Sequence, residues 1–360
     1  MIRELTAAHL DDLASGAQFL ATGGGGDPYL PLLLAKQALS QGNPVKLISC
    51  EEIRDDDLVV AVGGVGAPTV SLELLPSIDE AAIAIQHYEK FVGRKVNAVV
   101  CFEIGGANSL IPITAAALLG IPIADGDGMG RAFPEAQMTS FSISGVAPTP
   151  AVAIDYAGRT REFQNLDITR YEAEIRDFAT TAGGVVTVAE HGMSGRQLCE
   201  VAVRGTLSIC LEIGALLRKQ RGPVTLLLPR LTDLLSTTLY ERCKLIFTGK
   251  VIQKSTNTAD GFDVGECWLE DFNQPDETLQ IIIKNEFLVA LRRGEAVASV
   301  PDLIVVLEVD TAEPISVERL AFGQRVAVLA IPAPPFFRRE PALSVTNPQA
   351  FGLNVEYRPI

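Results

Sequence analysis

Residues 96–138 read VNAVVCFEIGGANSLIPITAAALLGIPIADGDGMGRAFPEAQM, and their pattern decides the fold. The apolar run 96–102 is short and rich in valine, which is typical of a buried strand, whereas residues 110–119 suit a buried helix. The apolar run 115–123 then leads into a polar, glycine-rich stretch. A strand, a helix and a second apolar run in succession predict an α/β layer with a largely parallel sheet.

The same alternation continues on both sides of this stretch. Apolar residues recur at helical spacing from residue 5 to 22, and that helix must stop at the four glycines 23–26. Ser194 and Gln197 fit a capping box at the start of another helix, which we expect to extend to residue 216. Further helices are predicted over 32–39 and 79–91, and further strands over 45–48, 58–62 and 185–189.

The character of the chain changes at residue 245. From there the apolar runs are short, β-branched and separated by turn residues, at 245–253, 266–270, 279–288, 303–309 and 325–331. We therefore predict an α/β N-terminal domain with a largely parallel sheet, formed by residues 1–165 and 166–244, plus a β-rich C-terminal domain over 245–360. The segment 166–244 would add one strand and one long helix to the first domain.

Composition narrows the class of protein. The chain has 360 residues and a net charge of −14, which argues against nucleic acid or an anionic membrane as the main partner. Its six cysteines are widely spaced and include no CxxC pair, so we expect free thiols. The start of the chain lacks a signal-peptide pattern, and no apolar run is long enough to cross a membrane. These features predict a soluble cytoplasmic protein.

The polar stretch after residue 123 is the first candidate site. Asp125 and Asp127 have alternate spacing, so in an extended chain both carboxylates would point to the same side, where they could divide acid and base roles or bind a divalent cation. Arg131 could bind a substrate carbonyl or carboxylate, or it could form a structural ion pair with Asp127 or Glu135. We predict catalytic roles for Asp125, Asp127, Arg131 and Glu135.

A second candidate group follows the strand at 96–102. Glu103 would lie at the end of this apolar strand, where a partly dry environment raises the pKa of a carboxyl group and suits it to acid–base work. Asn108 follows a Gly-Gly turn and could bind a ligand or act as a helix N-cap. Glu103 is therefore predicted as catalytic and Asn108 as ligand-binding.

Glycine-rich segments form a third group. Gly23, Gly24, Gly25 and Gly26, followed by Asp27, could let several backbone N–H groups converge on a ligand, or they could simply form a tight corner between two helices. The segment is not a P-loop, because no Lys-Ser or Lys-Thr follows it. A second glycine turn at 63–66 is expected to follow the strand 58–62, at the carboxyl edge of the sheet.

Three further residues are predicted to bind a ligand. His191 follows the strand 185–189 and would lie at another carboxyl edge. Asn285 and Glu286 form a polar pair inside the apolar run 279–288 and could line a cleft between the two regions, although a solvated strand face is an alternative. No HxH or HExxH spacing supports a strong metal site, so no metal ligand is assigned.

Five segments together resemble a known bacterial family. ATGGGGDPY, FEIGGANSLIP, ADGDGMGRAFPEAQM, KNEFL and VPDLIVVLE occur in this order and look like the family once described as domain of unknown function 917. That family is associated with S-methyl thiohydantoin desulfurase and is found near hydantoinase/oxoprolinase-type proteins. The resemblance spans nearly the whole chain. It implies an α/β N-terminal domain, a β-rich C-terminal domain and chemistry on five-membered cyclic imides.

If the desulfurase activity holds, the chain would hydrolyse a ring carbon that bears a methylthio group, which releases methanethiol and leaves a hydantoin. From the residue chemistry we assign Glu103 or Asp127 as the base, and Asp125 or Glu135 as the group that completes the proton transfers. Arg131 and the amides of residues 23–26 would stabilise the polar ring.

Three other functions stay open. One is a cyclic amidohydrolase that uses a divalent metal held by Asp125, Asp127 and Glu103; no other cofactor is predicted. The second is a non-catalytic subunit that binds a ligand beside a hydantoinase-type partner, and a nucleotide-dependent enzyme ranks third. The expected partners are a small-molecule substrate and hydantoinase/oxoprolinase-type proteins, and a homo-oligomer is compatible with the composition.

Overall fold

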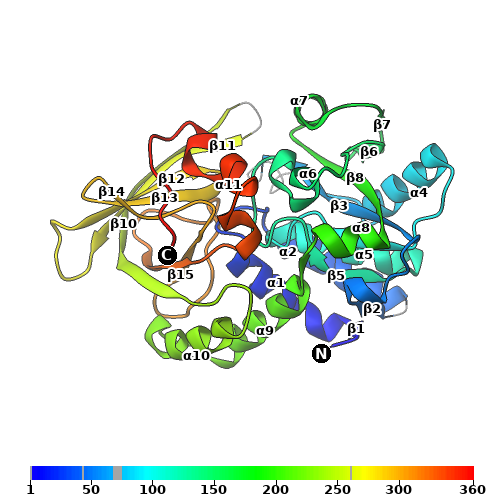
Figure 1. Ribbon diagram of the computed structural model, residues 1–360. Coiled ribbons are helices and arrows are strands. Elements are labelled where there is room, and N and C mark those ends of the chain that lie inside the picture. Colours follow the sequence, from blue (N-terminus) through cyan, green and yellow to red (C-terminus); the bar gives the residue numbers. More distant parts are fainter. Residues whose placement is uncertain (1, 43, 68–74, 260–261) are drawn as a thin grey trace.

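The computed structural model describes residues 2–42, 44–67, 75–259 and 262–360. Two β-sheets lie side by side, and α1 (Leu10–Leu20) lies between them (Figure 1). One sheet is covered by helices and the other is antiparallel throughout. The predicted fold class, an α/β N-terminal region followed by a β-rich C-terminal region, is confirmed.

The first sheet has a parallel core with antiparallel additions. Strands β2, β5, β4 and β3 are adjacent and parallel, and β1, β8, β6, β7 and β9 join them antiparallel. The strands are β1 (Glu4–Leu5), β2 (Val45–Ile48), β3 (Leu58–Gly66), β4 (Ala98–Cys101), β5 (Ile123–Asp127), β6 (Ala151–Ile154), β7 (Thr160–Phe163), β8 (Val185–Ser194) and β9 (Val203–Arg204). The sheet is thus mixed, and the prediction of parallel strands applies to its centre.

Four of the expected helices are present, the fifth is broken in two, and the helices over 168–181 and 224–236 were not predicted. The helices are α1, α2 (Tyr29–Gln41), α4 (Glu80–Val92), α5 (Ile111–Leu119), α6 (Ser140–Ile143), α7 (Ile168–Thr181), α8 (Gly195–Val201), α9 (Thr206–Lys219), α10 (Val224–Ser236) and α11 (Ala342–Thr346). Short 3-10 turns are η1 (Ala7–His9), η2 (Cys50–Glu52), η3 (Gly106–Ser109), η4 (Ala136–Met138), η5 (Pro335–Arg338) and η6 (Pro348–Phe351).

The single long helix expected from Ser194 to residue 216 is wrong. The capping box of Ser194 and Gln197 does begin α8, but α8 ends before β9, and α9 begins after Gly205. Gly205 has a left-handed backbone (φ 76°), and β9 pairs with β5. The sequence pattern did not reveal this break, because both helices and the strand between them bury apolar side chains and so continue one apolar stripe.

The second sheet has the strand order β14-β13-β12-β11-β10-β16-β15. Its strands are β10 (Lys244–Ala259), β11 (Phe262–Asp271), β12 (Thr278–Lys284), β13 (Glu286–Arg292), β14 (Glu295–Ser299), β15 (Leu303–Glu308) and β16 (Arg325–Ile331). The expected single run at 279–288 is instead two strands, because Asn285 adopts a left-handed backbone (φ 57°) and reverses the chain. The edge strands β14 and β15 lie in contact, and only residues 300–302 separate them in the chain.

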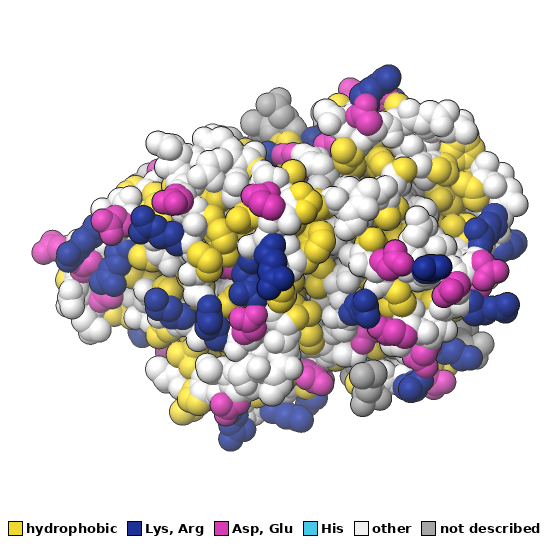
Figure 2. All heavy atoms as spheres, in the orientation of Figure 1, with side chains coloured by type: hydrophobic (Ala, Val, Ile, Leu, Met, Phe, Trp, Pro, Cys, Tyr) yellow, Lys and Arg dark blue, Asp and Glu magenta, His cyan; other side chains and the backbone are white. Residues whose placement is uncertain are grey.

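One hydrophobic core passes through both halves of the molecule. It includes Leu13 and Leu20 of α1, Cys101 of β4, Leu207 of α9 and Leu329 of β16. All six cysteines are free thiols, as expected. In the described part of the chain, no helix has both the length and the apolar character needed to cross a membrane. On the face drawn in Figure 2, basic and acidic side chains alternate.

Candidate functional site

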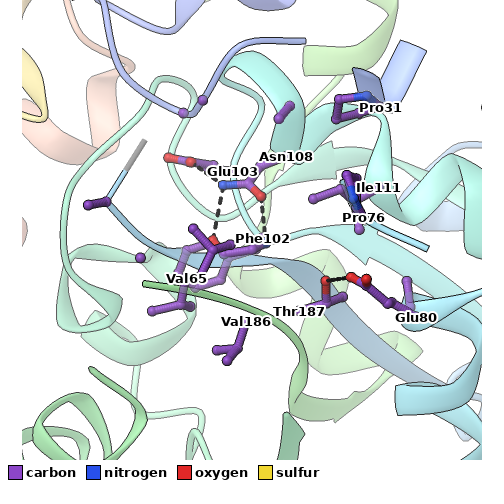
Figure 3. A pocket seen from close by; sticks show the side chains of 18 of the residues that line it. Pro31, Val65, Pro76, Glu80, Phe102, Glu103, Asn108, Ile111, Val186 and Thr187 are labelled. Atoms are coloured by element: carbon purple, nitrogen blue, oxygen red, sulfur yellow. Dashed lines mark hydrogen bonds between the residues drawn. The ribbon is translucent and has the colours of Figure 1, made fainter. Parts of the chain in front are cut away.

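A cavity of about 170 Å³ lies where the carboxyl ends of the parallel strands meet β13 of the second sheet. Apolar side chains form most of its wall, from Leu30, Leu34, Val65, Phe102, Ile111, Phe133 and Val186. Five carboxyl groups also line it, from Asp27, Glu80, Glu103, Glu172 and Glu286. A small, largely apolar cavity with a few convergent polar groups is typical of a small-molecule site (Figure 3).

Glu103 lies in this cavity, two residues beyond the end of β4. Its side chain is buried, with Oε1 accepting a hydrogen bond from Asn108 Nδ2 and Oε2 accepting one from the backbone N–H of Phe133 (3.2 Å). Burial raises the pKa of Glu103 to about 8, although both hydrogen bonds oppose that shift. The burial and the raised pKa of Glu103 agree with the sequence interpretation, and its catalytic role stays a prediction.

Asn108 holds Glu103 in place and does not cap a helix. Its Oδ1 accepts from the backbone N–H of Gly64 (2.6 Å), and its Nδ2 donates to the Gly64 carbonyl (3.3 Å) as well as to Glu103 (Figure 3). Asn108 lies within η3, and α5 has no side-chain cap. The glycines at 63–66 were predicted as a turn but form the last part of β3. Asn108 hydrogen-bonds to the backbone of Gly64 in this strand.

Glu286 enters the cavity from the other half of the molecule, at the first residue of β13. It is buried, and its Oε2 has no hydrogen-bond partner within the described residues. Burial raises its pKa well above the ordinary value, and the nearby charge of Glu103 adds to that shift. Asn285 sets this orientation, because it turns the chain while its Oδ1 accepts from the backbone N–H of Asp263 (2.8 Å).

The four glycines form the contact between the two halves, and two of them line the cavity. The carbonyl of Gly23 accepts from Val317 N (2.8 Å) of the second half, whereas the carbonyl of Gly25 accepts from Ala107 N (2.9 Å) within the first half. A Cβ at Gly24 would lie 2.0 Å from Glu286 Oε1, so a larger residue there would displace that carboxyl group. Of the four glycines at 23–26, Gly25 and Gly26 line the cavity.

Asp27 lines the cavity but already has partners. Its Oδ1 accepts from the backbone N–H of Tyr29 (2.8 Å) at the start of α2, and its Oδ2 accepts from Arg319 (2.5 Å). A carboxylate at a helix N-terminus is stabilised by the helix dipole. Asp27 thus joins α2 to the second half of the chain, and its predicted ligand-binding role stays a prediction.

Asp125 lies outside the cavity, on β5. Its Oδ1 accepts from Ser208 N (3.1 Å) and its Oδ2 from Ser208 Oγ, so the carboxylate holds the first turn of α9. Burial raises the pKa of Asp125, while the two bonds from Ser208 act in the opposite direction. These contacts give Asp125 a structural task at a helix terminus.

Asp127 also lies outside the cavity, and its carboxylate bonds to different residues from those that Asp125 contacts. Its Oδ2 accepts from the backbone N–H groups of Ile104 (2.9 Å), Met129 (2.9 Å) and Gly130 (2.7 Å). Burial raises its pKa to about 7, against the effect of those N–H groups. Asp127 therefore shapes the turn after β5 and fixes the backbone directly behind Glu103.

Arg131 is fully buried and does not line the cavity. Its guanidinium donates to the carbonyls of Ala132 (2.9 Å), Pro301 (2.8 Å) and Asp302 (2.8 Å) and to Thr22 Oγ1 (2.8 Å). The structural ion pair expected with Asp127 or Glu135 is replaced by these neutral acceptors. Burial lowers the pKa of Arg131 to about 10, so the side chain stays charged at neutral pH.

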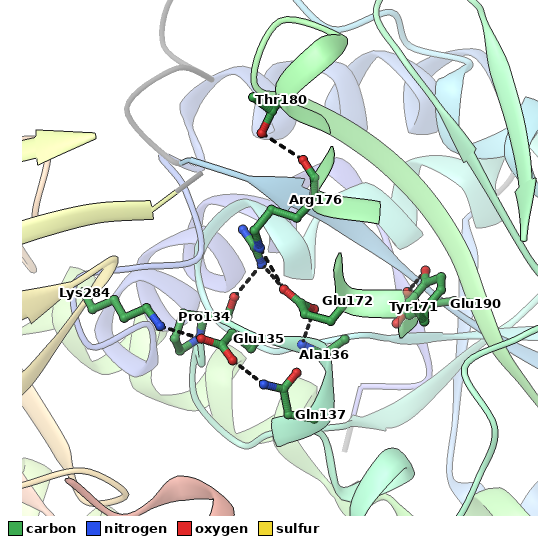
Figure 4. Close-up of polar contacts among 10 residues, drawn as sticks. All are labelled: Pro134, Glu135, Ala136, Gln137, Tyr171, Glu172, Arg176, Thr180, Glu190 and Lys284. Carbon is green, nitrogen blue, oxygen red and sulfur yellow. Dashed lines mark hydrogen bonds and ion pairs between the residues drawn. The ribbon is translucent and has the colours of Figure 1, made fainter. Parts of the chain in front are cut away.

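Glu135 lies beside the cavity, between Pro134 and Ala136, which both line it. Its Oε1 accepts from Lys284 Nζ (2.5 Å) of β12, and Oε2 accepts from Gln137 (Figure 4). The ion pair with Lys284 connects the two halves of the chain at the rim. Glu135 itself is not among the lining residues, and its catalytic role stays a prediction.

His191 does not lie at the carboxyl edge, which corrects the sequence interpretation. Strand β8 is antiparallel to β3, so its last residues lie at the amino end of the parallel core. The His191 side chain is buried there and does not line the cavity. The sequence did not reveal the direction of β8, because a buried strand reads as the same apolar run in either direction.

Sequence reasoning missed several polar lining residues, among them Glu80, Glu172, Arg176 and Thr187. Glu80 accepts from Thr187 Oγ1 (3.0 Å), and burial raises the pKa of Glu80 (Figure 3). Glu172 pairs with Arg176 and accepts from Ala136 N (2.9 Å); burial likewise raises its pKa (Figure 4). Thr187 was detectable as a polar residue inside the run 185–189, whereas Glu172 and Arg176 resemble an ordinary pair on a helix surface.

Metal-ligand geometry is the last test of the site. In the part of the chain that the structure describes, no group of three or more His, Cys, Asp or Glu residues is placed to hold a metal ion. Asp125 and Asp127 bond to different elements, and neither shares the cavity with Glu103.

With this geometry established, comparison with known proteins gives the family. Residues 8–165 match the family described as S-Me-THD-like, N-terminal domain, and residues 166–360 match S-Me-THD-like, C-terminal domain. The chain belongs to the S-Me-THD-like family. It is also similar to an X-ray crystal structure of a protein from Chromobacterium violaceum, with 26% identity and a TM-score of 0.80 over 99% of this chain and 100% of that one. No curated protein is significantly similar in sequence.

Proposed function

We propose that the cavity hydrolyses an S-methyl thiohydantoin and releases methanethiol and a hydantoin. The observation that carries this proposal is the pair of buried carboxyl groups, Glu103 and Glu286, which face one small apolar cavity from opposite halves of the chain. Membership of the S-Me-THD-like family supports the choice of ring. A compact neutral ring suits the apolar wall, and paired carboxyl groups suit proton transfer to and from it.

The environments of the two carboxyl groups suggest different roles. Glu103 accepts hydrogen bonds from Asn108 and the Phe133 amide, and both stabilise its charged form. Glu286 Oε2 has no such partner in the described residues, and the negative charge of Glu103 disfavours ionisation of Glu286. We therefore assign Glu103 as the base and Glu286 as the acid.

The proton transfers then balance. Glu103 takes a proton from water as the oxygen attacks the ring carbon that bears sulfur, and Glu286 protonates the ring nitrogen. When the tetrahedral intermediate collapses, its hydroxyl returns a proton to Glu286 and a carbonyl forms. The carbon–sulfur bond breaks, and the methanethiolate takes the proton from Glu103. At the end Glu103 is again ionised and Glu286 is again protonated.

The test is turnover of an S-methyl thiohydantoin, followed by the appearance of free thiol. We expect Glu103→Gln and Glu286→Gln each to lower kcat by at least about 100-fold, because each removes a proton-transfer group. The exposed Glu162→Gln on β7 is the matched control and should behave like wild type. Turnover close to wild type in both cavity variants would contradict the assignment.

The same assay separates the alternatives. Loss of turnover with a chelator, and its return with a divalent ion, would favour a metal-dependent amidohydrolase. Binding of the thiohydantoin without turnover until a hydantoinase-type protein is added would favour the partner-subunit function. We expect neither result.

A further inference from the structure

A second set of polar side chains lies away from the cavity, where α6, α7 and β8 meet. Ser142 Oγ of α6 lies 2.8 Å from His191 Nε2, and His191 Nδ1 lies 2.8 Å from Glu190 Oε1. Tyr171 of α7 donates its hydroxyl to Glu190 Oε2 (Figure 4). Glu190, His191 and Tyr171 are fully buried, whereas Ser142 is partly exposed.

The backbone is built to bring these groups together. Consecutive residues of a regular strand point to opposite faces, so a glutamate and the histidine after it do not normally meet. Here the β3–β8 pairing shifts register between Val59 and Ala61, and His191 adopts a left-handed backbone (φ 47°). Such a bulge re-aims a side chain, and a left-handed backbone is strained for histidine. This backbone conformation places the imidazole of His191 against the carboxylate of Glu190.

The contacts of His191 define the tautomer that acyl transfer at Ser142 requires, with the proton on Nδ1. Burial and the adjacent Glu190 raise the pKa of Tyr171 well above its ordinary value, so its hydroxyl stays protonated and donates. When Glu190 is ionised, Nδ1–H of His191 donates to Glu190 Oε1, and the lone pair of Nε2 then faces the hydroxyl of Ser142.

We propose that Ser142, His191 and Glu190 form a second catalytic site, a serine nucleophile with its base and orienting carboxylate, that acts on carboxylic esters. A serine hydroxyl in reach of an imidazole that a buried carboxylate orients is the arrangement that activates serine in acyl transfer. The Ser142 hydroxyl also lies 2.9 Å from the Ala136 carbonyl, which competes for the same proton at rest. The exposed residues Ser144 and Gly145 follow directly, and the space around the Gly145 Cα is open.

The reaction needs only water as co-reactant. Ser142 Oγ attacks the acyl carbon while Nε2 of His191 takes the hydroxyl proton, and the same proton then leaves with the alcohol as the ester bond breaks. Water next attacks the acyl-serine with His191 as base. The acid is released, and Ser142 regains its proton.

A fluorophosphonate probe tests this site on the wild-type protein, without reliance on any variant. We expect one phosphonyl group per chain, located on Ser142 by peptide mass spectrometry. Hydrolysis of 4-nitrophenyl acetate should fall at least tenfold in Ser142→Ala and in Glu190→Gln, and should be unchanged in the exposed control Ser144→Ala. Absence of label from Ser142, or equal ester hydrolysis by wild type and Ser142→Ala, would overturn the proposal. Because this assay does not use a thiohydantoin, its failure would leave the function of the cavity unaffected.

Discussion

At the scale of single residues, Glu103 was the most predictable part of the site and the carboxylates after β5 were the least. Glu103 lies at the carboxyl edge of the sheet because β4 is one of its parallel strands, and the alternation of strands and helices around β4 predicted that direction correctly. Asp125 and Asp127 have the same residue type and a similar position. Their bonds to Ser208 and to backbone N–H groups depend on how distant segments return to β5, which spacing does not reveal.

The pKa of Glu103 predicts the pH dependence of turnover. A base with a pKa of about 8 is mostly protonated at pH 6, so kcat/KM should rise about tenfold per pH unit from 6 and level off above 8. Asn108→Leu removes a bond that stabilises the carboxylate, so the inflection should move to higher pH. A pH–rate profile measures both effects, and a profile that is flat from pH 6 to 8 would refute this role for Glu103.

The same pKa predicts a pH-dependent stability. The pKa of Glu103 is raised on folding from 4.5 to about 8, so its favourable contribution is complete below pH 4.5 and is lost as pH rises through 8. Glu103→Gln cannot ionise. From pH 5 to pH 9, the free energy of unfolding of wild type should therefore fall relative to that of the variant, by on the order of a few kcal/mol. Urea titrations at both pH values measure this difference, and the opposite sign would contradict it.

At the scale of elements, the packing of α1 against α9 could not be predicted from either helix alone. A Cβ on Gly16 would lie 1.9 Å from the Cys210 carbonyl oxygen, and one on Gly214 would lie 1.7 Å from that of Asp12. The two glycines therefore permit a close approach of the two backbones. In the sequence each looks like a weak point in a helix, because glycine has a low helix propensity. The break between α8 and α9 escaped prediction for a related reason, since β5 supplies the partner for β9.

Gly16→Ala and Gly214→Ala test this packing by the sign of their effect. In a solvent-exposed helix this change is stabilising by about 0.5–1 kcal/mol, whereas here we expect each variant to lose about 1–3 kcal/mol through overpacking. The exposed Glu212→Ala on α9 is the control and should change little. Thermal or urea unfolding gives the sign, and stabilisation by either glycine substitution would disprove the close approach.

At the scale of the whole molecule, Arg131 and the glycines 23–26 join the α/β half to the β-rich half. Arg131 bonds to Thr22 next to the glycines and to the carbonyls of Pro301 and Asp302 in the turn before β15. The sequence could indicate that the α/β and β-rich regions exist, because each has its own periodicity. The polar pair Asn285 and Glu286 suggested a cleft between the two regions, and both residues line the cavity. The turn between them was missed, because the run 279–288 read as one continuous strand.

Arg131→Lys tests how strongly the halves are joined. Lysine keeps the charge but cannot reach four acceptors with one planar group, so buried carbonyls would lose their donors. We expect a loss of about 3 kcal/mol in the free energy of unfolding. Arg170→Lys on the surface of α7 should change it by less than about 0.5 kcal/mol. Similar urea midpoints for the two variants would exclude this role of Arg131.

The placement of Glu103 and Glu286 on opposite halves also constrains how such a protein evolves. Recombination that exchanged one half between two members of a family would bring together two carboxyl groups that had never been selected as neighbours. Under the proposed mechanism, the relative acidity of the pair depends on both gene segments, because the charge of Glu103 raises the pKa of Glu286. We therefore expect exchange of either half alone to disturb the chemistry of the cavity.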